Sequence, residues 1–280
     1  MNILIVGVGL IGGSFSLALK DRSDLSFAGF DLDQEALLKA KKIGLVDEVF
    51  SEMNSAVKWA DGIVLAIPVK AIKELLPVIL DKLESHQFVV DFGSTKNTIC
   101  ETADSHEKRD QFIAAHPIAG TEHSGPDAAF KELFVDKNLI LCDAEKTDLH
   151  KLMLFEDLAK SAGFYLTKMS AKEHDRHLAY ISHLSHITSY VLSNTVLNKE
   201  KDGEVILDLA GSGFESTVRL AKSSPRMWSS IFLENKEMVL KGIVAYKKEL
   251  EQLETLIENN EEDAIEEYLE EGRVIRKILK

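Results

Sequence analysis

Three glycines near the start of the chain, Gly7, Gly9 and Gly12, lie at G-x-G-x-x-G spacing directly after an apolar run at residues 3–6. The run has the length and branched side chains of a β-strand, and a helical pattern follows the glycines. In this context the first glycine permits a tight turn, the second lets the backbone approach a pyrophosphate, and the third allows a helix to pack closely on a strand. The loop therefore predicts a dinucleotide site.

An acidic residue indicates which dinucleotide binds. Asp31 ends a second strand-like run about 20 residues past the last glycine, where a carboxylate accepts hydrogen bonds from ribose hydroxyls. A carboxylate repels a 2′-phosphate and no arginine follows at once, so we expect NAD rather than NADP. The pyrophosphate would lie on N–H groups at the start of the helix, at Leu10 and Ile11, and Pro68, after a later strand, completes the expected cofactor residues. The alternative is a glycine-rich turn in another α/β protein.

Two polar side chains follow neighbouring strand-like runs. His116 precedes Pro117, which restricts the histidine backbone to extended conformations and so fixes the direction of the imidazole. Ser94 occupies the matching position after the preceding run. Together they could bind one substrate hydroxyl beside a nicotinamide, with histidine as proton acceptor because its ordinary pKa lies near neutrality. The alternatives are a turn serine and a helix-capping histidine.

Four histidines lie on one predicted helix: His174, His177, His183 and His186. At about 100° per residue, the first two and the last two point to opposite faces of an α-helix. They cannot converge on one ion, so we expect no metal site. We expect one pair to face a cleft and the other to pack or face water.

Two more residues of the C-terminal half could serve a site. Arg219 lies in a mostly apolar helical segment, where it either pairs with an acid or grips a carboxylate through two hydrogen bonds. Trp228 follows Pro225 and would either wall a pocket or fill a helical core.

The elements that position these residues follow from the hydrophobic pattern. Strand-like runs occur at residues 3–6, 27–30, 62–67, 88–91, 112–115, 138–142 and 164–167. They alternate with helical segments, which predicts parallel strands that bind ligands beyond their carboxyl ends. From Ser170, where an S-x-x-E capping box begins, helices are expected at about 170–197, 204–210, 214–223, 225–245 and 247–280. The prediction is an α/β fold, with a Rossmann-type, mostly parallel sheet domain at 1–168 and an all-helical domain at 169–280.

Composition narrows the class of protein. The chain has 280 residues and a formal net charge of −13, which argues against nucleic acid and anionic membranes as partners. Its longest apolar runs are strand-length, so we expect no transmembrane helix. Cys100 and Cys142 are too few for a disulfide framework, and a strand that begins at residue 3 leaves no room for a signal peptide. We therefore expect a cytoplasmic protein.

Longer motifs in the chain resemble those of prephenate dehydrogenases, enzymes of tyrosine biosynthesis. The motifs are DFGSTK at 91–96, HPIAGTEHSG at 116–125, ISHLSH at 181–186, GSGF at 211–214, RLAKSSP at 219–225 and MW at 227–228. They occur in the same order from the first strand through about Lys241, so the resemblance covers most of the chain. They are far more specific than the glycine pattern.

The resemblance implies an NAD-binding domain, a helical domain that forms a homodimer, and oxidative decarboxylation of prephenate to 4-hydroxyphenylpyruvate. By resemblance, His116 would take the proton of the ring hydroxyl as hydride leaves for the nicotinamide, and Ser94 would orient that hydroxyl and the cofactor. Arg219 and His183 would hold substrate carboxylates. The remaining residues that would line the site are Thr121, Glu122 and Trp228.

Other functions stay open at this point. Ser216 occupies a position where an acid is expected in some relatives. Without that acid, a charge relay next to Arg219 is in doubt. The nearest alternative is a dehydrogenase of arogenate, in which an amino group replaces the side-chain keto group. A β-hydroxyacid or imine-reducing dehydrogenase usually relies on a lysine or on different helical-domain residues, and the His-Pro-x-Ala-Gly stretch speaks against it. A non-catalytic NAD-binding regulator would need only the glycine loop and Asp31. It would leave four residues unexplained: Ser94, His116, His183 and Arg219.

Overall fold

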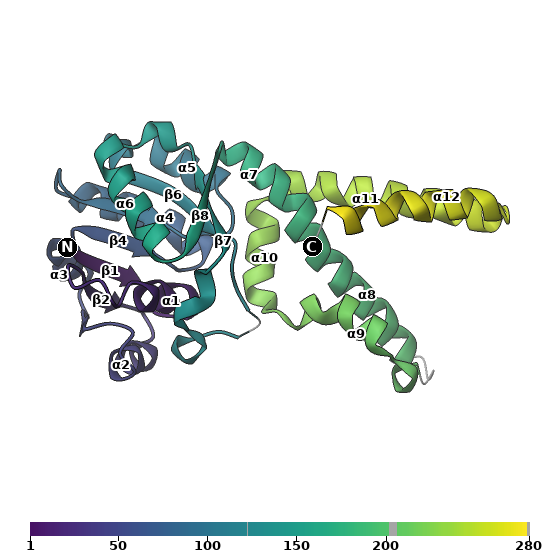
Figure 1. The fold of residues 1–280 in the computed structure, drawn as a ribbon, viewed down its shortest axis with the longest axis horizontal. Helices are drawn as coiled ribbons and strands as arrows, with labels where there is room; N and C mark the ends of the chain where they lie inside the picture. Colours follow the sequence, from purple (N-terminus) through teal and green to yellow (C-terminus); the bar gives the residue numbers. More distant parts are fainter. Residues whose placement is uncertain (122, 202–205, 279–280) are drawn as a thin grey trace.

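The structure is a computed structural model that describes residues 1–121, 123–201 and 206–278. A sheet with helices on both faces forms the first part of the chain, and helices form the described part of the rest (Figure 1). The expected fold class, a Rossmann-type sheet domain followed by a helical domain, is confirmed.

The sheet has eight strands in the order β3-β2-β1-β4-β5-β6-β7-β8. They are β1 (Asn2–Val6), β2 (Ser26–Phe30), β3 (Glu48–Val49), β4 (Gly62–Leu65), β5 (Phe88–Asp91), β6 (Phe112–Pro117), β7 (Lys137–Cys142) and β8 (Phe164–Met169). Every neighbouring pair is parallel except β6 and β7, which are antiparallel. The predicted strands all form, and the two-residue β3 was too short to show a periodicity. The strand order reverses between β1 and β4, which marks the crevice where ligands bind in such sheets.

Alternate residues of the strands enter two cores, one on each face of the sheet. In β1, Ile3 and Ile5 pack in one core, whereas Leu4 and Val6 pack in the other. The helices that cover the first face are α1 (Leu10–Ala18), α2 (Gln34–Lys42) and α6 (Leu149–Ser161). Those that cover the second are α3 (Met53–Trp59), α4 (Val69–Lys82) and α5 (Asn97–Asp104). Burial on both faces explains why the central strands are continuous apolar runs.

The helices that follow the sheet begin at the predicted capping box. Its elements are α7 (Ala171–Leu178), a π-helical segment (Ala179–His183), α8 (Leu184–Lys201), α9 (Ser212–Val218), α10 (Pro225–Glu234), α11 (Lys236–Glu258) and α12 (Glu262–Arg273). The Ser170 hydroxyl accepts a hydrogen bond from Glu173 N–H, and the Glu173 carboxylate accepts one from Ser170 N–H at 3.0 Å. The reciprocal pair fixes the first turn of α7.

Several of the expected helices differ from the prediction. The helix expected at 225–245 is divided at Asn235, and the one expected at 247–280 is interrupted at Asn260. Asn260 has φ +58°, a left-handed conformation that asparagine tolerates better than most residues. Of the helix expected at 204–210, residues 204 and 205 lie outside the described residues, and Leu207–Leu209 form one 3₁₀ turn.

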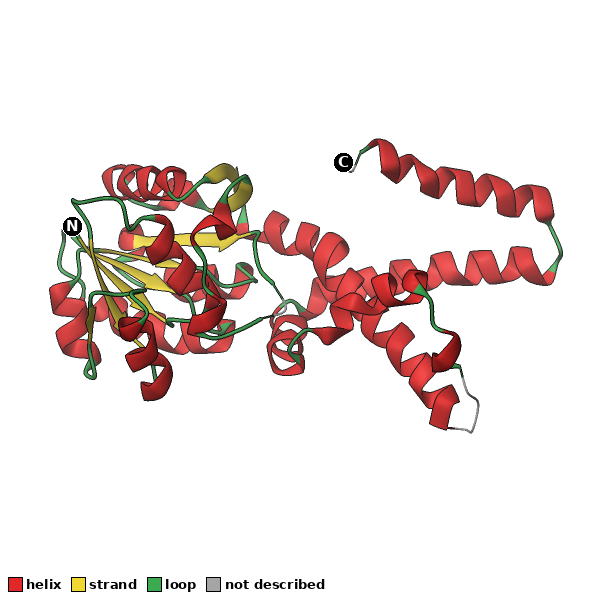
Figure 2. Cartoon of the chain, turned by 60° about the horizontal axis from the view of Figure 1, so that its bottom comes forward, coloured by secondary structure: helices red, strands yellow, loops and turns green. Residues whose placement is uncertain are grey.

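Helices α11 and α12 form an antiparallel hairpin that extends away from the sheet domain (Figure 2). Large apolar side chains along it are exposed, namely Leu240, Val244, Leu250, Ile257 and Leu269. Several exposed large apolar side chains on one hairpin are unusual on a lone chain. None of the helices in the described part of the chain combines the length and apolar character that crossing a membrane requires.

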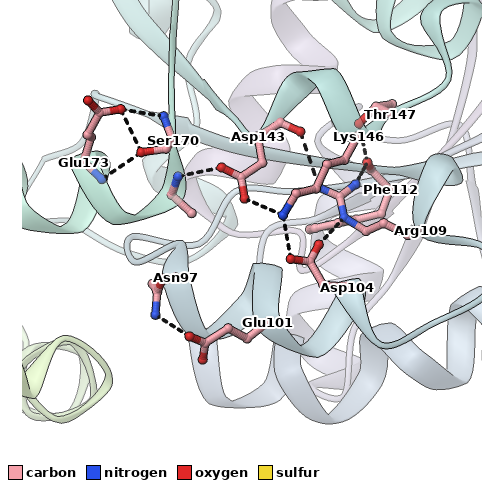
Figure 3. A network of polar contacts seen from close by, with 11 residues as sticks. Asn97, Glu101, Asp104, Arg109, Phe112, Asp143, Lys146, Thr147, Ser170 and Glu173 are labelled. Atoms are coloured by element: carbon pink, nitrogen blue, oxygen red, sulfur yellow. Dashed lines mark hydrogen bonds and ion pairs between the residues drawn. The ribbon is translucent and has the colours of Figure 1, made fainter.

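A polar network joins the end of β7 to the start of the helical domain (Figure 3). Asp143, after β7, accepts a hydrogen bond from Ala171 N–H at 2.9 Å and pairs with Lys146 at 3.2 Å. Lys146 also contacts Asp104, at the end of α5, at 2.6 Å, and Asp104 pairs with Arg109 at 2.8 Å. Exposed pairs contribute only about 0–1 kcal/mol each, so the network mainly fixes where α7 starts.

We expect Phe155→Ala to lower the free energy of unfolding by about 3–5 kcal/mol, because it removes buried surface and leaves a cavity. Phe155 is fully buried on α6, and its ring centroid lies 6.3–6.5 Å from those of Phe15, Phe88 and Phe92. Urea unfolding followed by circular dichroism measures the change. Leu149→Ala is the control, because Leu149 is on the same helix but 69% exposed and should change the value by less than about 0.5 kcal/mol. A similar small loss for Phe155→Ala would contradict this packing.

Candidate active site

The glycine loop between β1 and α1 is shaped for the close approach of a ligand. Gly7 has φ +93°, where a side chain would be strained, and a Cβ on Gly7 or Gly12 would overlap backbone atoms. At Gly9, by contrast, a Cβ would meet nothing nearer than 3.9 Å, so this side of the loop is open. Helix α1 begins beside it at Leu10 and Ile11, and the first N–H groups of a helix lack partners within the helix. The loop therefore fits a pyrophosphate.

The other predicted cofactor residues lie at the same edge of the sheet. Asp31 follows β2, and its carboxylate accepts hydrogen bonds from Val8 N–H at 3.1 Å and Asp33 N–H at 3.0 Å. The acid is thus held against the glycine loop, partly exposed, where a ribose would reach it. Pro68 is exposed at the start of α4, after the strand that pairs with β1. These donors and acceptors, gathered around one crevice, fit NAD.

His116 and Ser94 lie at the carboxyl ends of adjacent parallel strands. His116 is partly buried near the end of β6, and Ser94 lies in the loop after β5, the neighbour of β6. The Ser94 hydroxyl has no hydrogen-bond partner among the residues that the structure describes. The imidazole of His116 turns instead toward the helical domain.

Two side chains of α7 hold the His116 imidazole. His116 Nδ1 lies 2.8 Å from His174 Nε2, and His174 Nδ1 lies 2.7 Å from Asp175 Oδ1. His174 is fully buried and Asp175 nearly so. Asp175 also accepts hydrogen bonds from the N–H groups of Lys96 at 2.7 Å and Asn97 at 2.9 Å, where α5 begins. One carboxylate therefore joins α7 to α5 and ends a row of two imidazoles.

A buried ion pair contacts the backbone of the residue that precedes His116. The ammonium of Lys96 contacts the carboxylate of Asp91 and donates to the carbonyl of Ala115 at 2.7 Å. Both charged side chains are fully buried. Because Ala115 precedes His116, Lys96 fixes the backbone from which the imidazole projects.

Both imidazoles of the row are neutral near pH 7. Burial lowers the pKa of His116 well below its usual value of 6.5, and the nearby His174, Lys96 and His183 lower it further. Burial also lowers the pKa of His174, although Asp175 opposes the effect. A neutral imidazole has one free lone pair, so His116 can accept a proton.

His183 and Trp228 contact each other in the helical part of the chain. His183 is buried, its Nδ1 lies 3.2 Å from Asn235 Nδ2, and Asn235 also donates to the carbonyl of Asp175 at 2.7 Å. Burial lowers the pKa of His183 to about 4. The buried ring of Trp228 meets His183 edge-on and stacks on His186, with centroids 3.5 Å apart in the stacked pair.

The expectation that the histidine pairs face opposite sides of one helix is wrong. His174 and His183 are both buried and both lie next to the contact between Asp175 and Asn235, whereas His177 is exposed. The π-helical segment between them has i→i+5 hydrogen bonds, and one extra residue turns the following helix by about 100°. Among the described residues, no group of three or more His, Cys, Asp or Glu is placed to hold a metal ion.

The remaining predicted residues are more exposed. Arg219 begins a 3₁₀ turn after α9, is exposed, and makes no ion pair or hydrogen bond with its side chain in the described part of the chain. Burial lowers the pKa of His186, the hydrogen bond to the Ser182 carbonyl opposes this effect, and the charge of Arg219 lowers the pKa further. Thr121 is exposed and accepts a hydrogen bond from His123 N–H at 3.2 Å. Glu122 lies outside the described residues.

The arrangement fits a dinucleotide, places a neutral imidazole at His116, and leaves the Arg219 guanidinium without a partner among the residues that the structure describes. Three residues that sequence reasoning did not assign to the site are His174, Asp175 and Asn235. The capping box at Ser170 was the one sequence signal near them, because it fixes where α7 begins.

Comparisons with known proteins agree with this geometry. Two family models match, "Prephenate dehydrogenase, nucleotide-binding domain" over residues 15–167 and "Prephenate dehydrogenase, dimerization domain" over residues 170–271. A cyclohexadienyl dehydrogenase from Zymomonas mobilis is 32% identical over 281 residues, which cover 100% of this chain and 96% of that protein.

Solved structures are similar over the whole chain. Prephenate dehydrogenase from A. aeolicus, in complex with hydroxyphenyl propionate and NAD+, has a TM-score of 0.93 and 32% identity, covering 100% of this chain and 98% of that one. Synechocystis arogenate dehydrogenase has a TM-score of 0.84 and 30% identity, covering 100% of both chains. The chain belongs to the prephenate dehydrogenase family.

Proposed function

We propose that this protein oxidises and decarboxylates prephenate to 4-hydroxyphenylpyruvate with NAD, and that His116 is the base. The observation that carries the proposal is a neutral, hydrogen-bonded imidazole at the carboxyl edge of the sheet, in a member of this family. The glycine loop and Asp31 supply the NAD site. The aromatic carboxylate and NAD+ bound to the A. aeolicus relative support the choice of substrate class and cofactor.

The reaction needs a base at the ring hydroxyl. Removing the hydroxyl proton raises electron density at the carbon that bears it, which favours loss of hydride from that carbon. NAD, when bound, accepts the hydride. Loss of carbon dioxide from the opposite ring carbon then passes an electron pair through the ring to the oxygen, and the phenol forms when this oxygen takes a proton back. Because Nδ1 of His116 faces His174, Nε2 is the atom that takes and returns the proton.

The other proposed roles follow from charge and placement. Prephenate has two carboxylates, and Arg219 would bind one of them through two hydrogen bonds. His183 would act as a neutral donor, because Asn235 Nδ2 donates to its Nδ1 and leaves the proton on Nε2. Ser94 would orient the hydroxyl and the cofactor. The residues proposed to line the rest of the site are Thr121, Glu122 and Trp228.

We further infer a homodimer that forms through the helical domain, which would begin near residue 169. The exposed apolar side chains of α11 and α12 support it, as does the description of the matching family model as a dimerization domain. A cytoplasmic location is also proposed, because Cys100 and Cys142 are both free and buried. The second candidate substrate is arogenate, which the cyclohexadienyl and arogenate dehydrogenase relatives favour.

An absorbance assay for NADH formation tests the proposed reaction. We expect turnover with prephenate and NAD, and much less with NADP, because Asp31 repels a 2′-phosphate. The same assay with arogenate decides between the two candidate substrates. A clear preference for arogenate would replace prephenate in the proposal, and inactivity with both would refute it.

His116→Asn should lower kcat about 10²–10⁴-fold with little change in the KM for prephenate, because it removes the base but leaves the carboxylate contacts. Steady-state kinetics measures both constants. His177→Asn is the matched control, because His177 is an exposed histidine of α7 and should leave kcat unchanged. Near-normal turnover of His116→Asn would exclude His116 as the base.

Arg219→Ala should raise the KM for prephenate about 10–100-fold, because a hydrogen-bonded charge contributes about 1.5–3 kcal/mol to binding. Arg273→Ala removes another exposed arginine, in this case from α12, and should leave KM unchanged. If KM does not rise in Arg219→Ala, this guanidinium does not bind the substrate.

A further inference from the structure

Two buried side chains next to His116 have no part in the proposed proton transfer. His174 and Asp175 lie in sequence on α7, and neither contacts solvent appreciably. They connect to His116 through hydrogen bonds of 2.8 and 2.7 Å, and the His116 and His174 rings meet at 66°. Buried polar groups at hydrogen-bonding distance constrain one another's protons. The row therefore determines which nitrogens carry protons as well as how the rings pack.

The protons of the row can be placed in order from its charged end. A carboxylate only accepts hydrogen bonds, so His174 Nδ1 carries a proton and donates it to Asp175. A neutral His174 then has a lone pair on Nε2. His116 must donate to that lone pair from Nδ1, which leaves Nε2 of His116 without a proton.

We propose that His174 and Asp175 are positioning residues that hold His116 in the tautomer whose Nε2 is free to accept a proton. The inference deepens the proposed function and rests on the role of His116 as base. Without the row, an isolated imidazole would distribute its proton over both nitrogens, and the form protonated at Nε2 could not accept the hydroxyl proton.

The row also stabilises the charge that appears during the reaction. When His116 accepts a proton, its positive charge faces the carboxylate of Asp175 across one neutral imidazole. Two further groups face His116 from other elements: Lys96, before α5, and His183, in the π-helical segment, and both disfavour the charged ring. Asp175 acts in the opposite sense on His174, the ring that contacts His116, because it raises the pKa of His174.

The Asp175 carboxylate stays in place independently of His174. It accepts hydrogen bonds from Lys96 N–H and Asn97 N–H, and its backbone carbonyl accepts one from Asn235. Substituting Asp175 would therefore disturb α5 as well as the row. Substituting His174 tests the row alone.

Two variants of His174 separate the hydrogen bond from the packing. His174→Gln can place an amide oxygen near the position of Nε2 and accept the His116 proton, whereas His174→Phe fills the ring volume without an acceptor. We expect kcat to fall roughly 10²-fold in the Phe variant with KM for prephenate unchanged, and to recover to within about threefold of wild type in the Gln variant. A merely structural role would not produce this recovery.

Nitrogen NMR of ¹⁵N-histidine-labelled protein reads the tautomer directly and needs no substrate. The His116 signals are identified by their absence in His116→Asn. We expect Nδ1 protonated and Nε2 unprotonated in wild type and in His174→Gln, with the proton moving to Nε2 in His174→Phe.

Each outcome decides the inference. A wild-type His116 protonated on Nε2 would overturn it, even if His174→Phe fails to fold. Near-normal turnover of a folded His174→Phe would overturn it as well. Failure of the proposed function gives a different result. Wild-type protein that does not turn over prephenate, or an active His116→Asn variant, would refute the role of His116 as base. The NMR measurement would still test the tautomer of His116.

Discussion

The carboxylate of Asp175 is the contact on which the geometry of the site depends. It belongs to the helical domain, yet it accepts two N–H groups at the start of α5 in the sheet domain. Hydrogen bonds to a charged acceptor contribute about 1.5–3 kcal/mol each, and the start of a helix favours a negative charge. The same oxygen that accepts from Lys96 also accepts from His174, so the domain contact and the orientation of the imidazole row cannot change separately.

Lys96 carries this constraint to the backbone of β6. Its N–H is held by Asp175, while its ammonium donates to Ala115 and contacts Asp91. A buried ion pair is weak evidence for stability, since desolvation offsets much of the attraction. Its effect here is geometric. Lys96 holds the backbone of Ala115, the residue before His116, and His174 holds the His116 ring by a hydrogen bond. Both restraints lead back to one carboxylate.

Much of the fold and part of the site follow from the sequence, for identifiable reasons. The glycine loop, Asp31 and the strand before His116 were predictable because each depends on local spacing and on burial of a strand on both faces. The row through His174 was not predictable from the sequence. The π-helical segment changes the helical register, and no residue pattern in the chain indicates such a segment. The break at Asn235 was missed for a related reason, since its side chain bonds to Asp175, which lies far away in sequence.

The influences on His116 all lower its pKa, which suits the proposed base because it must release the proton it takes. Burial, Lys96 and His183 keep the imidazole neutral, so it is ready to accept the hydroxyl proton at pH 7. The same influences lower the pKa of the protonated ring, which in the proposed mechanism favours returning the proton to the oxygen once carbon dioxide has left. The carboxylate at the far end of the row acts to raise the pKa of His174, which lies between it and His116. Because formation of the aromatic ring drives the reaction, the protein needs a base that is correctly oriented more than one that is strong.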